Sequence, residues 1–167
     1  MRLLVIRHAI AEDRDAFATS GRDDTLRPLT DEGRRKMRRA ARGLRQLVRR
    51  PDALVASPLT RALETAEIVR AEYEMDRVEQ MPELAPERSL PDAVAALGRF
   101  PGAVVAIVGH EPQLSHLVTF LVTGNDLGAL ELKKGGACLL EFDGIPKAAA
   151  GTLLWAVRPS MLRDLVG

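Results

Sequence analysis

The sequence predicts one α/β domain over residues 1–167, built as a three-layer α/β/α sandwich around a mostly parallel central sheet. Short apolar runs alternate with segments whose apolar residues recur every three or four positions, a pattern typical of strands alternating with helices. The run Ala103–Val108 contains no polar residue, as expected of a strand that helices cover on both faces. A chain of 167 residues usually forms one domain and buries enough surface to fold without a metal or a disulfide.

The first part of the chain predicts a strand, a long loop and a helix. Leu3–Ile6 is a short apolar run and predicts a buried strand. The charged segment 9–28 predicts a loop, whose length is typical of functional or disordered segments. Thr30 is the expected N-cap of a long, arginine-rich helix that Pro51 ends.

The remaining elements follow in the same alternation. Ala53–Ala56 predicts the second strand, and Ser57 is the expected N-cap of the next helix, with Pro58 in its first turn. The elements predicted beyond them are a short segment at Val78, a helix around Pro91–Gly98, the strand Ala103–Val108, a helix marked by Leu114 to Leu121, and the strands Ala137–Phe142 and Thr152–Val157.

Three predicted strands are followed directly by residues that can bind an anion. Arg7 and His8 follow the first strand, Ser57 follows the second with Arg61 one turn later, and His110 follows the run that ends at Val108. If these strands are parallel neighbours, their carboxyl ends meet at one edge of the sheet, where ligands usually bind. Guanidinium forks match phosphate oxygens, and helix N-termini add backbone N–H donors. The sequence therefore predicts a phosphate site.

Composition argues against several other classes of protein. No apolar run approaches the roughly 20 residues of a membrane-spanning helix, and the N-terminal run is too short for a signal peptide. We therefore expect a cytoplasmic protein without membrane association. The single cysteine, Cys138, excludes an internal disulfide. Motifs for a phosphate-binding loop, a dinucleotide or zinc are absent, so we expect neither a metal nor a cofactor.

The net charge of +1 is unevenly distributed, because basic residues outnumber acidic ones in residues 1–50 and the reverse holds in the remainder. This basic region indicates either a surface that attracts an anionic ligand or the solvated face of one helix. The chain has few aromatic residues for base stacking and no nucleic-acid motif, so we expect no nucleic-acid partner. Nucleic-acid binding through the arginine-rich helix stays open as an alternative.

Four motifs, in the same order along the chain, resemble those of the histidine phosphatase (phosphoglycerate mutase-like) superfamily. They are Leu4–Ala9, Arg27–Gly33, Ser57–Ala66 and Val108–Pro112. Within the superfamily the chain is most similar to the SixA-like branch of protein phosphohistidine phosphatases, through the segments Arg27–Thr30, Met81–Pro86 and Lys133–Ala137. One departure is Ala9, where many members have glycine. The resemblance implies the histidine phosphatase fold with a minimal cap.

The resemblance also implies an activity, that of a metal-independent phosphatase with His8 as nucleophile and a phosphohistidine intermediate. Arg7, Arg61 and His110 would neutralise the phosphoryl oxygens in the transition state. Two neighbouring guanidinium groups are expected to keep His8 neutral, so that its lone pair is available for attack.

The other site residues carry less defined roles. Ser57 and Arg27 are expected to bind substrate. Many small-molecule phosphatases of the superfamily use a glutamate as proton donor, and its nearest match is Glu83, with Glu87 or no acid at all as the alternatives. A missing acid favours phosphohistidine as substrate, because imidazole leaves more easily than an alkoxide.

We therefore expect a monomeric hydrolase that acts on phosphohistidine in proteins, which implies a phosphorylated protein partner and a place in signal transduction. One alternative is a phosphatase of small phosphomonoesters from the same superfamily. Another is a phosphate-binding module without turnover.

Overall fold

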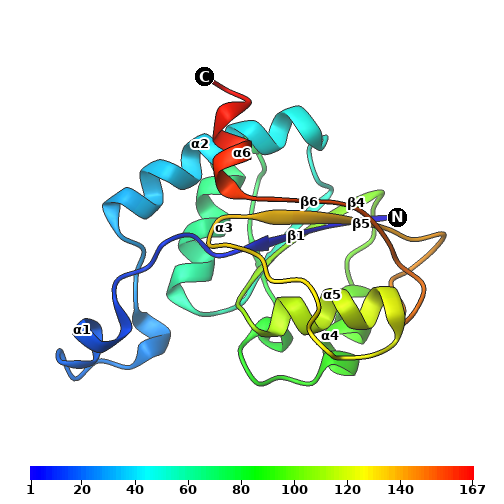
Figure 1. The fold of residues 1–167 in the computed structure, drawn as a ribbon, viewed down its shortest axis with the longest axis horizontal. Helices are drawn as coiled ribbons and strands as arrows, with labels where there is room; N and C mark the ends of the chain where they lie inside the picture. Colours follow the sequence, from blue (N-terminus) through cyan, green and yellow to red (C-terminus); the bar gives the residue numbers. More distant parts are fainter.

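The structure, a computed structural model, describes residues 1–167 and is centred on one six-stranded sheet with the strand order β3-β2-β4-β1-β5-β6 (Figure 1). The strands are β1 (Arg2–Arg7), β2 (Ala53–Ala56), β3 (Glu79–Gln80), β4 (Val104–Gly109), β5 (Ala137–Glu141) and β6 (Thr152–Val157). Strands β3, β2, β4 and β1 run parallel to one another, whereas β5 is antiparallel to both of its neighbours, β1 and β6. The mostly parallel sheet is confirmed, with β5 as the strand that runs in the opposite direction.

Helices cover both faces of this sheet, which confirms the three-layer architecture. One face carries α2 (Asp31–Leu47), α3 (Thr60–Tyr73) and α6 (Pro159–Asp164), and the other carries α4 (Leu90–Leu97) and α5 (Gln113–Thr123) (Figure 1). A single turn of 3₁₀ helix, η2 (Pro82–Leu84), lies between β3 and α4. None of the helices combines the length and the apolar character that crossing a membrane would need.

Alternating side chains of the central strands build two separate cores. In β1, Leu4 and Ile6 pack with α2 and α3, whereas Leu3 and Val5 pack with α4 and α5. All four side chains are fully buried. Since both faces of the strand are apolar, the run reads as continuous rather than alternating, as is typical of parallel sheets.

The N-cap of α2 is as predicted, but its end is not. The Thr30 hydroxyl accepts a hydrogen bond from the Gly33 N–H at 2.9 Å, which satisfies one of the free donors of the first turn. The helix ends at Leu47, four residues before Pro51, because Val48 already adopts an extended conformation. In the middle of α2, Gly43 lacks a side chain where the Leu162 carbonyl of α6 approaches, so α6 packs directly on the α2 backbone.

The prediction that Ser57 caps the next helix is wrong. Helix α3 begins at Thr60, with Leu59 as its N-cap and without a side-chain capping bond. The Ser57 hydroxyl instead lies 2.8 Å from Nε2 of His110, across the sheet edge. The N-cap of α5, Pro112, likewise makes no side-chain capping bond, and the Glu111 carboxylate instead accepts the Ser115 N–H of the first turn.

Segment 9–28, predicted as a loop, contains regular secondary structure. It contains the short helix α1 (Arg14–Ala18) and the 3₁₀ helix η1 (Asp24–Leu26), which Asp13 and Asp23 cap respectively. The segment projects beyond the carboxyl edge of the sheet, toward which β1 runs (Figure 1). An isolated antiparallel bridge pairs Ala11 with Leu29 and ties the two ends of the segment together, through the hydrogen bonds that the Glu12 N–H donates to the Pro28 carbonyl and the Thr30 N–H donates to the Ile10 carbonyl. One wall beside the sheet edge is therefore built from this segment.

Candidate active site

The sheet topology brings the predicted site residues to one edge. Strands β2, β4 and β1 are parallel neighbours, and the register pairs Arg7 with Gly109 at their carboxyl ends. A pocket of about 840 Å³ opens there, and Arg7, His8, Arg61 and His110 all line it. The residues that the sequence separates by up to a hundred positions thus share one cavity, whose other walls come from segment 9–28 and the loop before α4.

The imidazoles of His8 and His110 face each other in this pocket. Their ring centroids are 5.1 Å apart and the ring planes are inclined by 52°. Both side chains are buried. Nδ1 of His8 lies 2.7 Å from the carbonyl oxygen of its neighbour Ala9, and since a carbonyl only accepts, Nδ1 must carry the proton. In neutral His8 the lone pair therefore lies on Nε2.

Burial keeps His8 neutral. The pKa of His8 is lowered to about 3, mainly by burial and in smaller part by the positive charges of Arg61 and Arg7, against the opposing hydrogen bond to Ala9. The two guanidinium groups were expected to cause this effect, but removal of the ring from water is the larger cause. At neutral pH the Nε2 lone pair is thus available to attack an electrophile.

His110 is neutral as well. Its pKa is lowered to about 2, mainly by burial and in smaller part by the neighbouring His8 and Arg61. Its Nε2 pairs with the Ser57 hydroxyl at 2.8 Å, whereas its Nδ1 is buried without a partner in the protein. Before an anion binds, His110 can therefore act as a neutral hydrogen-bond donor, and its role in neutralising phosphoryl oxygens stays a prediction.

The side chains of Arg7 and Arg61 are each held by a backbone carbonyl oxygen. Nη1 of Arg7 donates to the Leu132 carbonyl at 2.6 Å, and Nη1 of Arg61 donates to the Asp24 carbonyl at 3.0 Å. The Nε atom of each guanidinium is buried without a partner in the protein. Buried donors are nearly always paired, so two unpaired Nε–H groups on one pocket mark a site for an anion.

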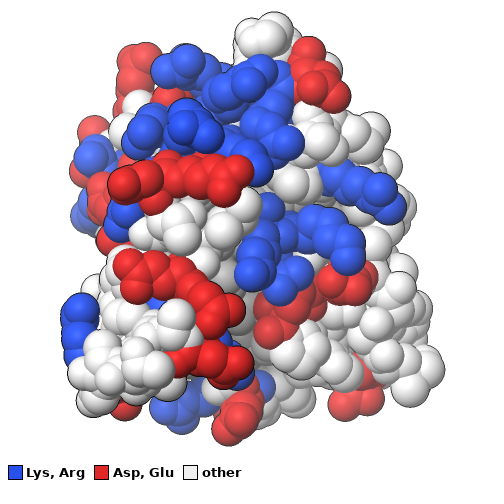
Figure 2. Space-filling view, turned by 60° about the vertical axis from the view of Figure 1, so that its left-hand side comes forward, with Lys and Arg blue, Asp and Glu red and all other residues white.

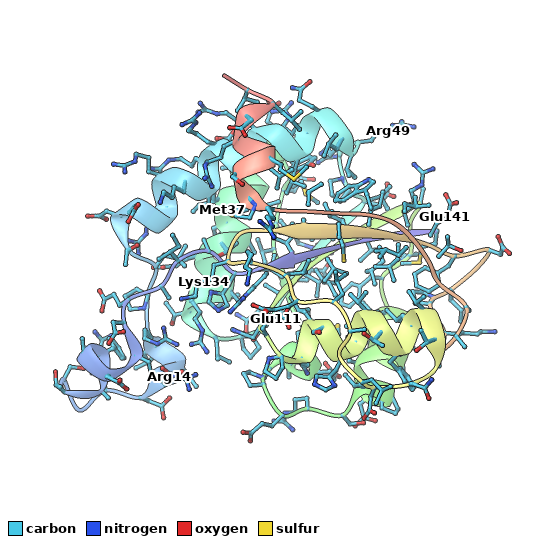
Figure 3. All side chains as sticks on the ribbon, in the orientation of Figure 1. Arg14, Met37, Arg49, Glu111, Lys134 and Glu141 are labelled. Atoms are coloured by element: carbon cyan, nitrogen blue, oxygen red, sulfur yellow. The ribbon has the colours of Figure 1, made fainter.

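Asp24 connects three arginines of the pocket wall. Its Oδ1 accepts a hydrogen bond from Arg27 Nε at 2.7 Å and lies 3.8 Å from Arg14 Nε, and its Oδ2 lies 3.3 Å from Arg61 Nη1. The hydrogen bond from Arg27 is the main reason that the pKa of Asp24 is lowered. Asp24 belongs to η1 in the projecting segment, which also carries Arg14 (Figure 3). This carboxylate orients the three arginines. Asp24 was not among the site residues predicted from the sequence.

Arg27 lies where the sequence argument expected it, on the pocket wall. The side chain is buried, and its Nη1 donates to the Glu12 carbonyl at 2.7 Å. Lys134, which the sequence argument did not include in the site, also lines the pocket, and its charge helps to lower the pKa of His8. Its loop is fixed by Gly135, whose N–H donates to the carbonyl oxygens of Arg7 and His8.

Two predicted site residues do not face the pocket. Ser57 is fully buried behind His110 and does not line the cavity, so the expectation that it binds substrate is corrected to one of positioning His110. Both carboxylate oxygens of Glu83 lie within hydrogen-bond distance of Arg99 Nη2, at 3.0 and 3.1 Å, and Glu83 lies off the pocket wall. The ion pair with Arg99 turns this carboxylate away, which corrects its assignment as proton donor. Glu87, the alternative, lines the pocket.

Glu111 lines the pocket and supports its arginine side through the backbone. Its Oε1 accepts the Leu132 N–H at 2.8 Å and its Oε2 accepts the Ser115 N–H at 3.0 Å. Burial raises the pKa of Glu111. Because the Leu132 carbonyl holds Arg7, Glu111 positions Arg7 through the backbone of residue 132. No group of three or more His, Cys, Asp or Glu side chains is placed to hold a metal ion.

Comparison with known proteins identifies the class to which this fold and pocket belong. The family model of the histidine phosphatase superfamily (branch 1) matches residues 3–92, and the chain belongs to this superfamily. Within it, the chain is SixA-like. The structure of the protein histidine phosphatase SixA complexed with tungstate superimposes with a TM-score of 0.80 and 27% identity, over 97% of this chain and 99% of that chain.

Two further relatives extend the comparison. An uncharacterised protein of Picosynechococcus is 36% identical over 139 residues, which cover 81% of this chain and 82% of the relative. The alpha-ribazole phosphatase from Shigella flexneri has a TM-score of 0.73 at 18% identity, over 95% of this chain and 97% of that chain. At that identity the similarity shows a shared fold only, so the chain is a phosphatase of this superfamily whose substrate the comparisons do not define.

Proposed function

We propose that this phosphatase removes phosphoryl groups from phosphohistidine side chains of proteins, with His8 as its nucleophile. The observation that carries the proposal is the state of His8, whose ring is neutral, protonated on Nδ1 by its bond to Ala9 and free at Nε2. A nucleophile in this state needs no general base. SixA, the protein histidine phosphatase that this chain resembles, was solved with tungstate, a tetrahedral oxyanion like phosphate.

The reaction would proceed in two displacements. In the first, the Nε2 lone pair of His8 forms a bond to phosphorus while the bond from phosphorus to the substrate imidazole breaks, and this ring, already protonated by solvent at its second nitrogen, leaves as neutral imidazole. In the second, water forms a bond to phosphorus while the bond from phosphorus to His8 Nε2 breaks, which releases inorganic phosphate and a proton to solvent and restores the neutral ring. The unpaired Nε–H groups of Arg7 and Arg61 would bind the phosphoryl oxygens through both steps.

His110 would act as a hydrogen-bond donor to the same oxygens. If the Ser57 hydroxyl donates to Nε2 of His110, then Nδ1 carries the proton and can donate it to a phosphoryl oxygen. A bound phosphoryl dianion would also raise the pKa of His110 and favour its charged form. His110 would therefore stabilise the anion most strongly when the anion is present.

The leaving group favours phosphohistidine over phosphoesters. Glu83, the nearest match to the expected acid, is paired to Arg99 and lies off the pocket wall. A phosphorylated imidazole has a second ring nitrogen that can be protonated near neutral pH, so the ring leaves without an acid from the enzyme. An alkoxide has no second atom that can be protonated in this way, so its departure needs an acid from the enzyme.

The alternative substrate class is a small phosphomonoester, and one observation favours it. Glu87 lines the pocket, so a carboxyl group that could protonate a leaving alkoxide is present on its wall. A phosphatase of this kind would hydrolyse aryl and sugar phosphates faster than phosphohistidine.

One assay separates the two substrate classes. Purified protein would be given a phosphohistidine-containing protein, a phosphohistidine peptide, an aryl phosphate and a sugar phosphate at equal concentration, with His8→Ala as the blank for contaminating activity. The proposal requires the highest kcat/KM on the phosphohistidine substrates. A higher kcat/KM on the esters would overturn it in favour of the small-molecule class.

A further inference from the structure

A second, smaller hollow adjoins the active-site pocket. It has a volume of about 170 Å³ and lies between α2, α6 and the loop before β5. Lys134 lines both cavities, and Ala9, which lines the hollow, directly follows His8, which lines the pocket. The two spaces therefore meet at the same piece of backbone.

Two glycines shape the walls of the hollow. A side chain at Gly33 would collide with the carbonyl oxygen of Ile10, so only glycine lets the first turn of α2 approach this backbone. Gly135 has a φ of +78°, a left-handed conformation that side chains disfavour, and it lies beside Met37. Figure 3 labels Met37 and Lys134 around this region.

The rim of the hollow is basic. Lys36, Lys134 and Arg163 line it, and no carboxylate does. Lys36 forms an ion pair with Glu32 at 2.5 Å, whereas Lys134 and Arg163 form none. The wall of the main pocket differs, because five carboxylates line it beside its basic residues: Glu12, Asp13, Glu87, Glu111 and Asp126.

The surface around the site shows the same separation of charge. On the face that Figure 2 presents, Lys and Arg side chains form separate groups, with acidic side chains between and below them. A basic hollow free of carboxylates concentrates anions, and the guanidinium of Arg163 can bind a carboxylate through two parallel hydrogen bonds.

We propose that this hollow binds an acidic side chain of the substrate, an Asp or Glu within a few residues of the phosphohistidine. The inference rests on the proposed function and adds a specificity to it. The volume of the hollow suits one carboxylate side chain and is too small for a helix or strand of a partner protein. Because an extended peptide advances about 3.3 Å per residue, a neighbouring side chain can reach the hollow while the phosphoryl group lies at His8.

The test compares matched phosphohistidine peptides that carry Glu or Gln at each of the three positions on either side of the phosphohistidine. At one or more positions we expect the Glu peptide to have a higher kcat/KM by about two- to fivefold, the range of a partly exposed ion pair. Arg163→Gln should remove this preference and leave hydrolysis of an aryl phosphate unchanged. Arg35→Gln, an exposed arginine of α2 outside the hollow, is the matched control and should keep the preference.

The outcomes separate this inference from the proposed function. If Glu and Gln peptides are hydrolysed equally at every position, or if Arg163→Gln slows both equally, the hollow is not an acidic subsite, although the phosphohistidine activity stands. If no phosphohistidine peptide is hydrolysed while the aryl phosphate is, the proposed function fails. The subsite is then judged by calorimetric binding of the same peptides to His8→Ala protein, where equal affinity for Glu and Gln peptides, or no binding, would overturn it.

Discussion

Nδ1 of His8 lies 2.7 Å from the carbonyl oxygen of Ala9, the next residue in the chain. This contact fixes the ring orientation and the tautomer of His8 with backbone alone, since the acceptor can only be met by an N–H. The reactive Nε2 consequently points away from Ala9, into the pocket that Arg7 and Arg61 line. The state of the nucleophile is therefore a property of the turn that follows β1.

The covalent role of His8 predicts that His8→Ala loses turnover on every substrate while keeping its fold. Without the imidazole there is no lone pair to form the phosphoryl-enzyme bond. Acid-quenched samples of the wild-type protein with labelled substrate should contain phosphorylated histidine, and the variant should contain none. Near-full activity in the variant would exclude the covalent route.

Arg61→Ala should lower kcat by about a hundredfold or more, a loss of about 3 kcal/mol in transition-state stabilisation. Arg61 lines the pocket and its buried Nε–H has no partner in the protein, so its loss removes both a charge and an unpaired donor from the proposed phosphoryl site. Steady-state kinetics on an aryl phosphate measure this loss. The control is Arg49→Ala, which removes an exposed arginine just beyond α2. An equal loss of kcat in this control would point to a general effect of charge.

Asp24→Asn should weaken anion binding without removing activity. The substitution removes the charge that holds Arg27, Arg61 and Arg14 together, and because Asp24 is partly exposed we expect a rise of about three- to tenfold in KM and in the inhibition constant of tungstate. The matched control is Asp23→Asn, a neighbour whose side chain caps η1 and contacts none of these arginines. Tighter binding of tungstate in Asp24→Asn would mean that the carboxylate competes with the substrate instead.

Glu83→Gln should leave kcat on phosphohistidine unchanged, because its carboxylate pairs with Arg99 away from the pocket. Glu87→Gln tests the other carboxylate on the same assay and on an aryl phosphate. A large drop in kcat with Glu83→Gln would show that the ion pair opens during the reaction. A drop with Glu87→Gln confined to the aryl phosphate would assign Glu87 to ester hydrolysis.

The stability of the protein should decrease as the pH falls from about 6.5 toward 3. The pKa of His8 is lowered to about 3 and that of His110 to about 2, below the 6.5 of a free imidazole. In this window the unfolded chain binds more protons than the folded one, so the free energy of unfolding rises with pH and is lost on acidification. Urea denaturation at a series of pH values measures the slope. His8→Asn should have a shallower slope than wild type, and an identical slope would contradict the lowered pKa.

The strands and their terminal residues were predictable because they rest on local signals. The continuous apolar runs of β1 and β4 required burial on both faces, and the parallel arrangement then brought Arg7, His8 and His110 to one edge. The helix α2 followed from its spacing and its Thr30 cap. These features need no knowledge of side-chain direction.

The residues that sequence reasoning misplaced depend on long-range contacts. Ser57 has the composition of a helix cap, but the partner of its hydroxyl is His110, 53 positions away. Glu83 lies near the expected acid position, and only the fold shows that Arg99 turns it outward. Asp24 lies in a segment without apolar periodicity, so no pattern marked it. The short helix α6 was missed because six residues give too little periodicity.

The anchors of Arg7 and Arg61 are backbone oxygens, those of Leu132 and Asp24. A main-chain acceptor persists through any substitution that preserves the path of the chain, so Arg7 depends on the backbone of residue 132 and not directly on its side chain, which is buried in the core beside α4 and α5. Replacing Leu132 with another apolar residue that fits this core would leave catalysis intact, whereas an insertion or deletion in the loop before β5 would displace the guanidinium. In this enzyme, loop length rather than side-chain identity is the constraint on that arginine.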